Sequence, residues 1–305
     1  MTKPKICHIA CTLGEIQGVY SEASGFAEVS ERESMLKIPD MWGWGNYYLT
    51  GDIFSLAQQS IKKTLHEANL SPTEVDLVIF SAATMPGGIA DLNARIATTL
   101  SPMGISSANV IGQTLGGCAT TLSAMIMASD LVTANVYKNV MIVAIETLPA
   151  ELNRFDKFAI FSDASVSFLV SSKLPDGFEI ISSAYKTSIN EILHGSGLQE
   201  PVLNKSSIFQ ALDQAGIAIS DIKKVFSNNT FLPVKMFREK SIGFTHDQID
   251  ISNVANIGHC FSCDSILNYH LYQSSHPERD EGYYLLFADS DGHAATVLIK
   301  ETASH

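Results

Sequence analysis

Near its middle the chain reads Ile111-Gly112-Gln113-Thr114-Leu115-Gly116-Gly117-Cys118-Ala119-Thr120-Thr121. A β-rich run breaks there at paired glycines and continues as a long helical pattern. Cys118 therefore stands at the start of a helix, where unpaired N–H groups and the helix dipole lower a thiol pKa and favour an anion. This placement suits a nucleophile that carries an acyl group. The alternative is a small buried thiol behind a tight turn.

The composition is that of a protein with a large core. The chain has 305 residues, 46% hydrophobic and 17% charged, which is enough for one large domain or two closely packed halves. A net charge of −12 argues against a nucleic-acid partner, which needs a basic face. No apolar run reaches the ~20 residues that span a bilayer, and the N-terminus lacks a signal-peptide pattern. We therefore expect a cytoplasmic protein without a membrane partner.

The five cysteines form an odd set, which without a secretory signal indicates reduced thiols. Cys260 and Cys263 make a Cys-x-x-Cys pair, and zinc or redox use would need a second pair or a thioredoxin-like context. The sequence shows neither. We predict that this pair packs on one helix face, and that the protein has no metal site and no cofactor.

The sequence repeats itself in order. Residues 65–78 end a helical pattern, turn and enter a strand pattern, and residues 212–225 do the same with Leu, Ala, Leu/Ile, Glu/Asp and Val in register. Gly117-Cys118 opens one helix, and Gly258-His259 opens its counterpart. A repeat of this kind predicts a duplicated α/β protein, with one half at 1–173 and the other at 174–305.

Continuous apolar strand patterns alternate with helical ones, as in a largely parallel sheet buried on both faces. The order predicts five layers, α/β/α/β/α, with Cys118 and His259 close together at the starts of the two central helices. We expect strands at Ile6–Leu13, Asp76–Ser81, Asn109–Gln113, Val140–Ile145, Val166–Ser171, Lys224–Ser227, Tyr283–Ala288 and Thr296–Ile299. We expect helices at Asp52–Ala68, Ile89–Leu100, Ala119–Val136, Ser207–Ala215, Leu232–Ser241 and Phe261–Tyr272.

The chain resembles the thiolase superfamily, and most of all its 3-oxoacyl-ACP synthase III (KAS III) branch, over nearly its whole length. Besides the Gly-Gly-Cys-Ala-Thr-Thr segment at 116–121, the similar pieces are Ser81-Ala82-Ala83-Thr84-Met85-Pro86, Phe161-Ser162-Asp163-Ala164-Ser165, Ser227-Asn228-Asn229-Thr230 and Asn256-Ile257-Gly258-His259. The resemblance implies the thiolase fold, a homodimer, and acyl-CoA or acyl-carrier protein as partners.

The resemblance also implies a mechanism. Cys118 takes an acyl group from a CoA or phosphopantetheine thioester, and a second substrate is condensed onto it, usually with decarboxylation of a malonyl thioester. The backbone N–H groups of Cys118 and Gly292 would hold the acyl oxyanion. The resemblance further implies that four residues contact the substrate: Trp42, Met85, Asn229 and Phe231.

The assisting residues depart from the KAS III pattern. Asn228 stands where that family has His, and His259 stands where it has Asn, an order like that of the thiolases. The set remains usable, because His259 can accept the Cys118 proton and Asn228 with protonated His259 can hold an oxyanion. In the alternative, His259 only caps its helix.

Two loops also differ from the pattern of the KAS III family. Asp289 lies at about the position of the second thiolase Cys, so its carboxylate could serve as a base, could repel a malonyl carboxylate, or could belong to a plain surface turn. In the N-terminal loop, Trp42 matches a family Trp that stacks on the CoA adenine. Asn46 replaces the Arg expected four residues later, which departs from the usual CoA contacts. The aromatic stretch 41–48 lines an acyl tunnel or packs under the dimer.

The sequence thus predicts a cytoplasmic, homodimeric KAS III-like acyltransferase with Cys118 as covalent nucleophile. It would move an acyl group to a carbon, nitrogen or oxygen nucleophile in specialised, fatty-acid or polyketide biosynthesis. One alternative is a non-decarboxylating, thiolase-like condensation with Asp289 as base. Another is a catalytically silent partner of a second ketosynthase-like subunit.

Overall fold

The computed structural model describes residues 3–195, 202–276 and 281–301. Its main sheet has the strand order β5-β4-β6-β7-β1-β8-β11-β10-β9. The first five strands are β5 (Asn109–Gln113), β4 (Leu77–Ser81), β6 (Asn139–Glu146), β7 (Ala164–Ser171) and β1 (Lys5–Leu13). The other four are β8 (Phe178–Thr187), β11 (His293–Glu301), β10 (Gly282–Ser290) and β9 (Ile222–Phe226).

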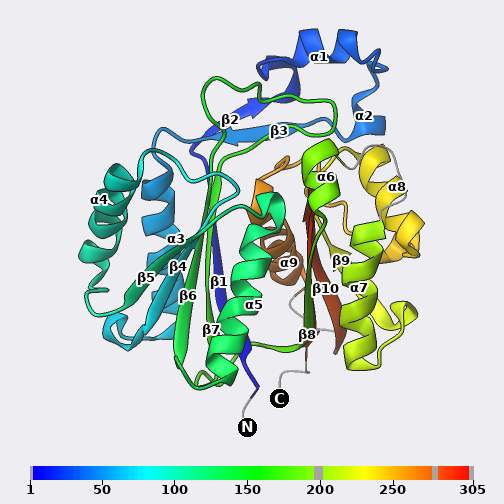
Figure 1. Ribbon diagram of the computed structural model, residues 1–305. Helices are drawn as coiled ribbons and strands as arrows, with labels where there is room; N and C mark the ends of the chain where they lie inside the picture. The colour runs from blue at the N-terminus through cyan, green and yellow to red at the C-terminus, as the bar shows by residue number, and fades with distance from the viewer. Residues whose placement is uncertain (1–2, 196–201, 277–280, 302–305) are drawn as a thin grey trace.

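The nine strands form two sheets, which are joined to each other at one end only. Strand β1 pairs with β7 along most of its length, but with β8 only at Lys5↔Glu179 and Ile6↔Phe178. Beyond that junction the two groups of strands diverge, and two helices fill the space between them (Figure 1). These helices are α5 (Thr120–Thr133) and α9 (Asp264–Ser275). One large apolar core joins them to both sheets.

The remaining long helices form the two outer layers (Figure 1). α3 (Ile53–Ala68) and α4 (Ile89–Leu100) cover the first sheet, and α7 (Val202–Ala215) and α8 (Leu232–Ile242) lie on the second. The α/β/α/β/α layering expected from the repeated sequence is therefore confirmed. The expected division at 173/174 falls in the connection between β7 and β8, where the chain passes from the first sheet to the second.

Local sequence explains the outer helices well. The Asp52 side chain accepts a hydrogen bond from the backbone N–H of Phe54 and caps the start of α3. The apolar face of α3 recurs every three or four residues and is buried against the first sheet. Asn69 adopts the left-handed conformation that ends the helix.

The sequence analysis missed several elements. They are β2 (Ile16–Val19), α1 (Phe26–Arg32), α2 (Pro39–Trp42), β3 (Asn46–Leu49), β8 and α6 (Ile189–His194). The predicted helix at Phe261–Tyr272 begins as a 3₁₀ turn over Phe261–Cys263 and becomes α9 only at Asp264. No helix among the described residues is long and apolar enough to cross a membrane.

Candidate active site

Cys118 lies in a 3₁₀ turn, Gly117–Ala119, between the end of β5 and the start of α5. Gly117 has φ +52°, and a Cβ there would overlap the side chain of Ser290 at the end of β10. Glycine is therefore required for two reasons, backbone conformation and space. The second sheet thus reaches the nucleophile turn of the first through Ser290.

The structure places Cys118 beside His259, where the duplicated halves predicted it. The Cys118 Sγ lies 3.4 Å from His259 Nε2. The loop that holds His259 is fixed by the segment at 160–162: His259 N–H donates to the Ile160 carbonyl at 2.7 Å, and Ser162 N–H donates to the His259 carbonyl at 2.9 Å. Aromatic rings of Phe161 and Phe261 pack against the imidazole.

A third residue, Asp264, completes the arrangement, and sequence reasoning missed it. Its Oδ2 accepts a hydrogen bond from His259 Nδ1 and another from Asn229 N–H at 2.6 Å, while Oδ1 accepts from Cys260 N–H at 2.7 Å. A carboxylate only accepts, so Nδ1 carries the hydrogen and Nε2 is left as an acceptor for the thiol. The signal available in the sequence was an acid in the first turn of the helix that follows His259.

The expected lowering of the Cys118 pKa is wrong. Burial raises the pKa of this thiol well above its ordinary value, and the carboxyl groups of Glu146, Asp264 and Asp289 raise it further; Arg238 opposes them. The helix start does not outweigh these effects. The resting sulfur is therefore a thiol, so the proton has to leave as the sulfur attacks.

Glu146, at the end of β6, is a second acid that the sequence analysis did not single out. It is 2% exposed, and its Oε1 accepts hydrogen bonds from Ala83 N–H at 2.9 Å and from the Ser262 hydroxyl. Thr121 Oγ1 lies 2.6 Å from Ser262 Oγ, which extends the network to α5. Burial, the largest cause, raises the pKa of Glu146 to about 8.

Asn228, in the loop after β9, and Asp289, near the end of β10, lie together at one end of the second sheet. Asn228 Nδ2 donates to the Asp289 carbonyl at 2.7 Å and faces its Oδ1 at 3.3 Å. Arg238 donates to Asp289 Oδ1 at 2.9 Å, and Asn204 Nδ2 donates to Oδ2 at 2.9 Å. Asp289 thus belongs to a partly buried polar network and not to a plain surface turn.

Asn229 and Phe231, two of the residues predicted to bind substrate, are both buried. Asn229 donates from Nδ2 to the Gly258 carbonyl at 3.0 Å and from its backbone to Asp264, so it supports the site from below the surface. Phe231 is 1% exposed in an aromatic cluster with Trp44 and Phe155. These contacts give both residues a packing role, and their binding of substrate stays a prediction.

Trp42 and Met85 are more accessible. Trp42 stacks on Trp44, with ring centroids 5.9 Å apart, and donates from Nε1 to the Leu36 carbonyl at 2.7 Å. Much of the aromatic stretch 41–48 therefore packs within the chain itself. Met85 is half-buried against the outer core of the first sheet. Their predicted contacts with substrate remain predictions.

Gly292 lies in the turn between β10 and β11 with φ +71°. Its carbonyl accepts a hydrogen bond from Ser188 N–H at 2.9 Å, and a Cβ there would overlap Ile192 of α6. The turn is therefore anchored to α6. Its predicted contribution to an oxyanion hole stays a prediction.

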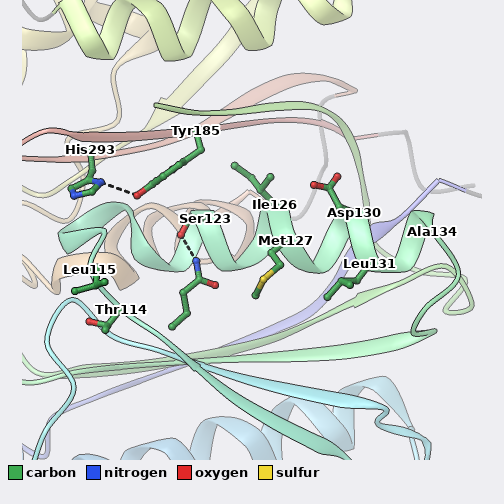
Figure 2. Close-up of a pocket in the computed structure, with 11 residues that line it drawn as sticks. Thr114, Leu115, Ser123, Ile126, Met127, Asp130, Leu131, Ala134, Tyr185 and His293 are labelled. Atoms are coloured by element: carbon green, nitrogen blue, oxygen red, sulfur yellow. Dashed lines mark hydrogen bonds between the residues drawn. The ribbon is translucent and has the colours of Figure 1, made fainter. Parts of the chain in front are cut away.

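A pocket of about 570 Å³ lies along one face of the central helix α5, and Cys118 is not among the residues that line it (Figure 2). Thr114 and Leu115, from the loop that leads to Cys118, line one end. At the same end Tyr185 Oη lies 2.8 Å from His293 Nδ1. Burial lowers the pKa of His293 and raises that of Tyr185. The rest of the lining is Gln113, Ser123, Ile126, Met127, Asp130, Leu131 and Ala134.

The layered fold brings a Cys and a His together where the two halves join, and comparisons with known proteins show which family this arrangement resembles. The family model for 3-oxoacyl-[acyl-carrier-protein] synthase III matches residues 114–188. The β-ketoacyl-[acyl-carrier-protein] synthase III of Caldanaerobacter subterraneus subsp. tengcongensis is 24% identical over 131 residues, 42% of this chain and 38% of that protein. The Aquifex aeolicus enzyme of that name is 24% identical over 143 residues, 46% and 45% of the two chains. The alignments thus span less than half of these relatives.

Solved structures match over the whole fold. The 3-oxoacyl-[acyl-carrier-protein] synthase III of Aquifex aeolicus VF5 superposes with a TM-score of 0.79 at 14% identity, covering 98% of this chain and 100% of that one. ChlB3, described as an acyltransferase, gives 0.79 at 13% identity over 99% and 98%. A variant of Xanthomonas campestris OleA gives 0.82 at 10% identity over 98% and 97%. The chain therefore has the thiolase-like fold of these structures, and its sequence resembles that of 3-oxoacyl-[acyl-carrier-protein] synthase III.

Proposed function

We propose that this protein is a KAS III-like acyltransferase that forms a thioester on Cys118 and passes the acyl group to a second substrate. The observation that supports this most directly is the line of contacts from Cys118 Sγ through His259 to Asp264. A nucleophile, a base within reach of it, and a carboxylate that orients the base form the arrangement that activates Ser and Cys nucleophiles in acyl transfer.

The first step is transfer of the acyl group to the enzyme. His259 Nε2 takes the proton from Cys118 while Sγ forms a bond to the thioester carbon. The bond from that carbon to the sulfur of CoA or of a carrier arm then breaks, and His259 returns the proton to the departing thiolate. We propose that the backbone N–H groups of Cys118 and Gly292 hold the oxyanion of this step.

The contacts of Asp289 favour transfer to an oxygen or nitrogen nucleophile. Both of its carboxylate oxygens accept hydrogen bonds, one of them from a guanidinium, so it is poorly placed to act as a base in a thiolase-like condensation. The intact line from Cys118 to Asp264 counts against a silent partner subunit.

Mass spectrometry of the intact protein tests the proposal. Incubation with a panel of acyl-CoA and acyl-carrier thioesters is expected to add one acyl mass to the wild-type protein and none to Cys118→Ala. Cys11→Ala is a matched control, because Cys11 is only partly buried whereas Cys7, Cys260 and Cys263 are fully buried. Absence of an adduct with every thioester would contradict the enzyme proposal.

We also propose that the protein is a homodimer. β5 is the edge strand of the first sheet, and its Val110 and Ile111 are 43% and 39% exposed. Leu115, just beyond β5, is 82% exposed and lines the pocket along α5. An apolar edge strand with unpaired backbone groups is a surface that monomers rarely leave open. A second copy of this chain, related by a twofold axis, would cover it.

A further inference from the structure

The amide of Asn228 has a fixed orientation. Its Nδ2 donates to the Asp289 carbonyl and faces the Asp289 carboxylate. A flipped amide would place Oδ1 against these two acceptors. The hydrogen-bond network therefore determines which atom of the amide is Oδ1 and which is Nδ2. Lys235, fully buried, also holds this segment by donating from Nζ to the Asn228 carbonyl at 3.0 Å.

The opposite end of the amide has no partner among the described residues. Asn228 is 3% exposed, and its Oδ1 accepts no hydrogen bond from any of them. Buried acceptors without a partner are uncommon in folded proteins, because leaving water without a replacement hydrogen bond costs free energy. An acceptor of this kind in an active site indicates a donor that the protein itself does not supply.

Short chains of contacts connect Asn228 to the base and to the nucleophile turn. The next residue, Asn229, donates its backbone N–H to Asp264 Oδ2, the same oxygen that accepts from His259. Asp289, which holds the amide, is followed by Ser290, whose side chain lies against Gly117. Asn228 is therefore linked to His259 through Asn229 and Asp264, and to the turn that holds Cys118 through Asp289 and the adjacent Ser290.

We infer that Asn228 Oδ1 accepts a hydrogen bond from the second substrate, and that this substrate presents two donor hydrogens at or beside its nucleophilic atom. A primary amine or a vicinal diol has this chemistry. One hydrogen faces His259 Nε2 and the other faces Asn228 Oδ1. This inference rests on the proposed acyl transfer and defines its acceptor. An enolate, which offers only an acceptor oxygen, would meet repulsion from Oδ1.

The transfer balances without any further reagent. The nitrogen or oxygen of the acceptor forms a bond to the acyl carbon, and His259 Nε2 takes the proton that this atom loses. The bond between the acyl carbon and Cys118 Sγ breaks. The proton then passes from His259 to the sulfur, which restores the thiol.

The test uses acyl-loaded, full-length protein and pairs of acceptors that differ in one hydrogen. Butylamine is compared with N-methylbutylamine, and propylene glycol with its methyl ether, by following loss of the acyl mass from Cys118. The member with two hydrogens is expected to react about five- to tenfold faster at low acceptor concentration, the size of effect that one hydrogen bond gives. The effect should lie mainly in the KM for the acceptor.

Asn228→Leu, which has similar volume but no acceptor, should abolish the preference within each pair. Asn93→Leu, on an exposed part of α4, should keep it. Equal rates within both pairs for the wild type, or a preference that persists in Asn228→Leu, would overturn the inference. The wild-type comparison decides the matter even if the Leu variant does not fold. If Cys118 accepts no acyl group at all, the proposed function falls together with the inference.

Discussion

The reactivity of Cys118 depends on its neighbours more than on its place at a helix start. Burial and nearby carboxyl groups raise its pKa, so at neutral pH the sulfur keeps its hydrogen. A thiol in that state attacks a thioester slowly unless a base removes the proton during attack. His259 lies within reach, and Asp264 fixes the tautomer that lets it accept.

Asp264→Asn tests this dependence. An Asn side chain can turn its oxygen or its N–H₂ toward His259 Nδ1, and in the second case His259 holds its hydrogen on Nε2 and loses the ability to accept from Cys118. We expect the rate of acyl loading to fall by about 10²–10⁴, with the fold retained. Single-turnover loading followed by mass spectrometry measures the rate. Asp213→Asn, on an exposed turn of α7, serves as control, and unchanged loading in Asp264→Asn would contradict the assignment.

The sequence could predict part of this site. Cys118 and His259 follow from the repeat, because equivalent helix starts in two halves meet at the pseudo-twofold axis. Asp264 could not be found in the same way, since its role depends on a 3₁₀ turn at Phe261–Cys263 that brings it back under His259. The fixed amide of Asn228 depends on Asp289 and Arg238, and Asp289 is far away in the sequence.

At the level of elements, Glu146 joins three parts of the fold. It ends β6 and accepts hydrogen bonds from the loop after β4 and from the turn before α9. A buried carboxyl in this position is most stable when protonated, which is why its pKa is raised to about 8. The same group contributes to the raised pKa of Cys118.

Glu146 is therefore expected to make the stability depend on pH. Its pKa is higher in the folded chain than its ordinary 4.5, so its contribution is fully present below about pH 4.5 and is lost as pH rises through about 8. Between about pH 6 and about pH 8 the free energy of unfolding should fall by about 2 kcal/mol more in the wild type than in Glu146→Gln. Urea unfolding at both pH values measures this. The exposed Glu151→Gln should behave as wild type, and equal slopes for Glu146→Gln would contradict the prediction.

Predicting elements worked where periodicity was strong. α3 shows a clean apolar face, and β6 and β7 are mostly apolar or small because both faces of the sheet are covered. β8 was missed because Ser182 and Ser183 interrupt its apolar pattern, although it pairs with β11 along most of its length. The hydrogen bonds of β8 come from pairing with a strand that is distant in the sequence, and the local sequence pattern does not predict such pairing.

On the scale of the whole molecule, the layers leave one edge of the first sheet open. Within the described part of the chain, β5 pairs with β4 on one side and with no strand on the other. The loop from β5 leads directly to Cys118, so whatever covers β5 also lies close to the nucleophile turn. Assembly and activity are therefore expected to be linked.

Ile111→Lys places a charge in the middle of this edge strand, a substitution that blocks pairing between strand edges. Light scattering after size-exclusion chromatography should give twice the mass of one chain for the wild type and the mass of a single chain for the variant. Acyl loading of Cys118 should also slow in the monomeric variant, because the loop at Thr114–Gly117 would lose its cover. Ile89→Lys, at a position 80% exposed on α4, provides the control for an added surface charge. A wild-type protein that is monomeric at all concentrations would contradict the proposed dimer.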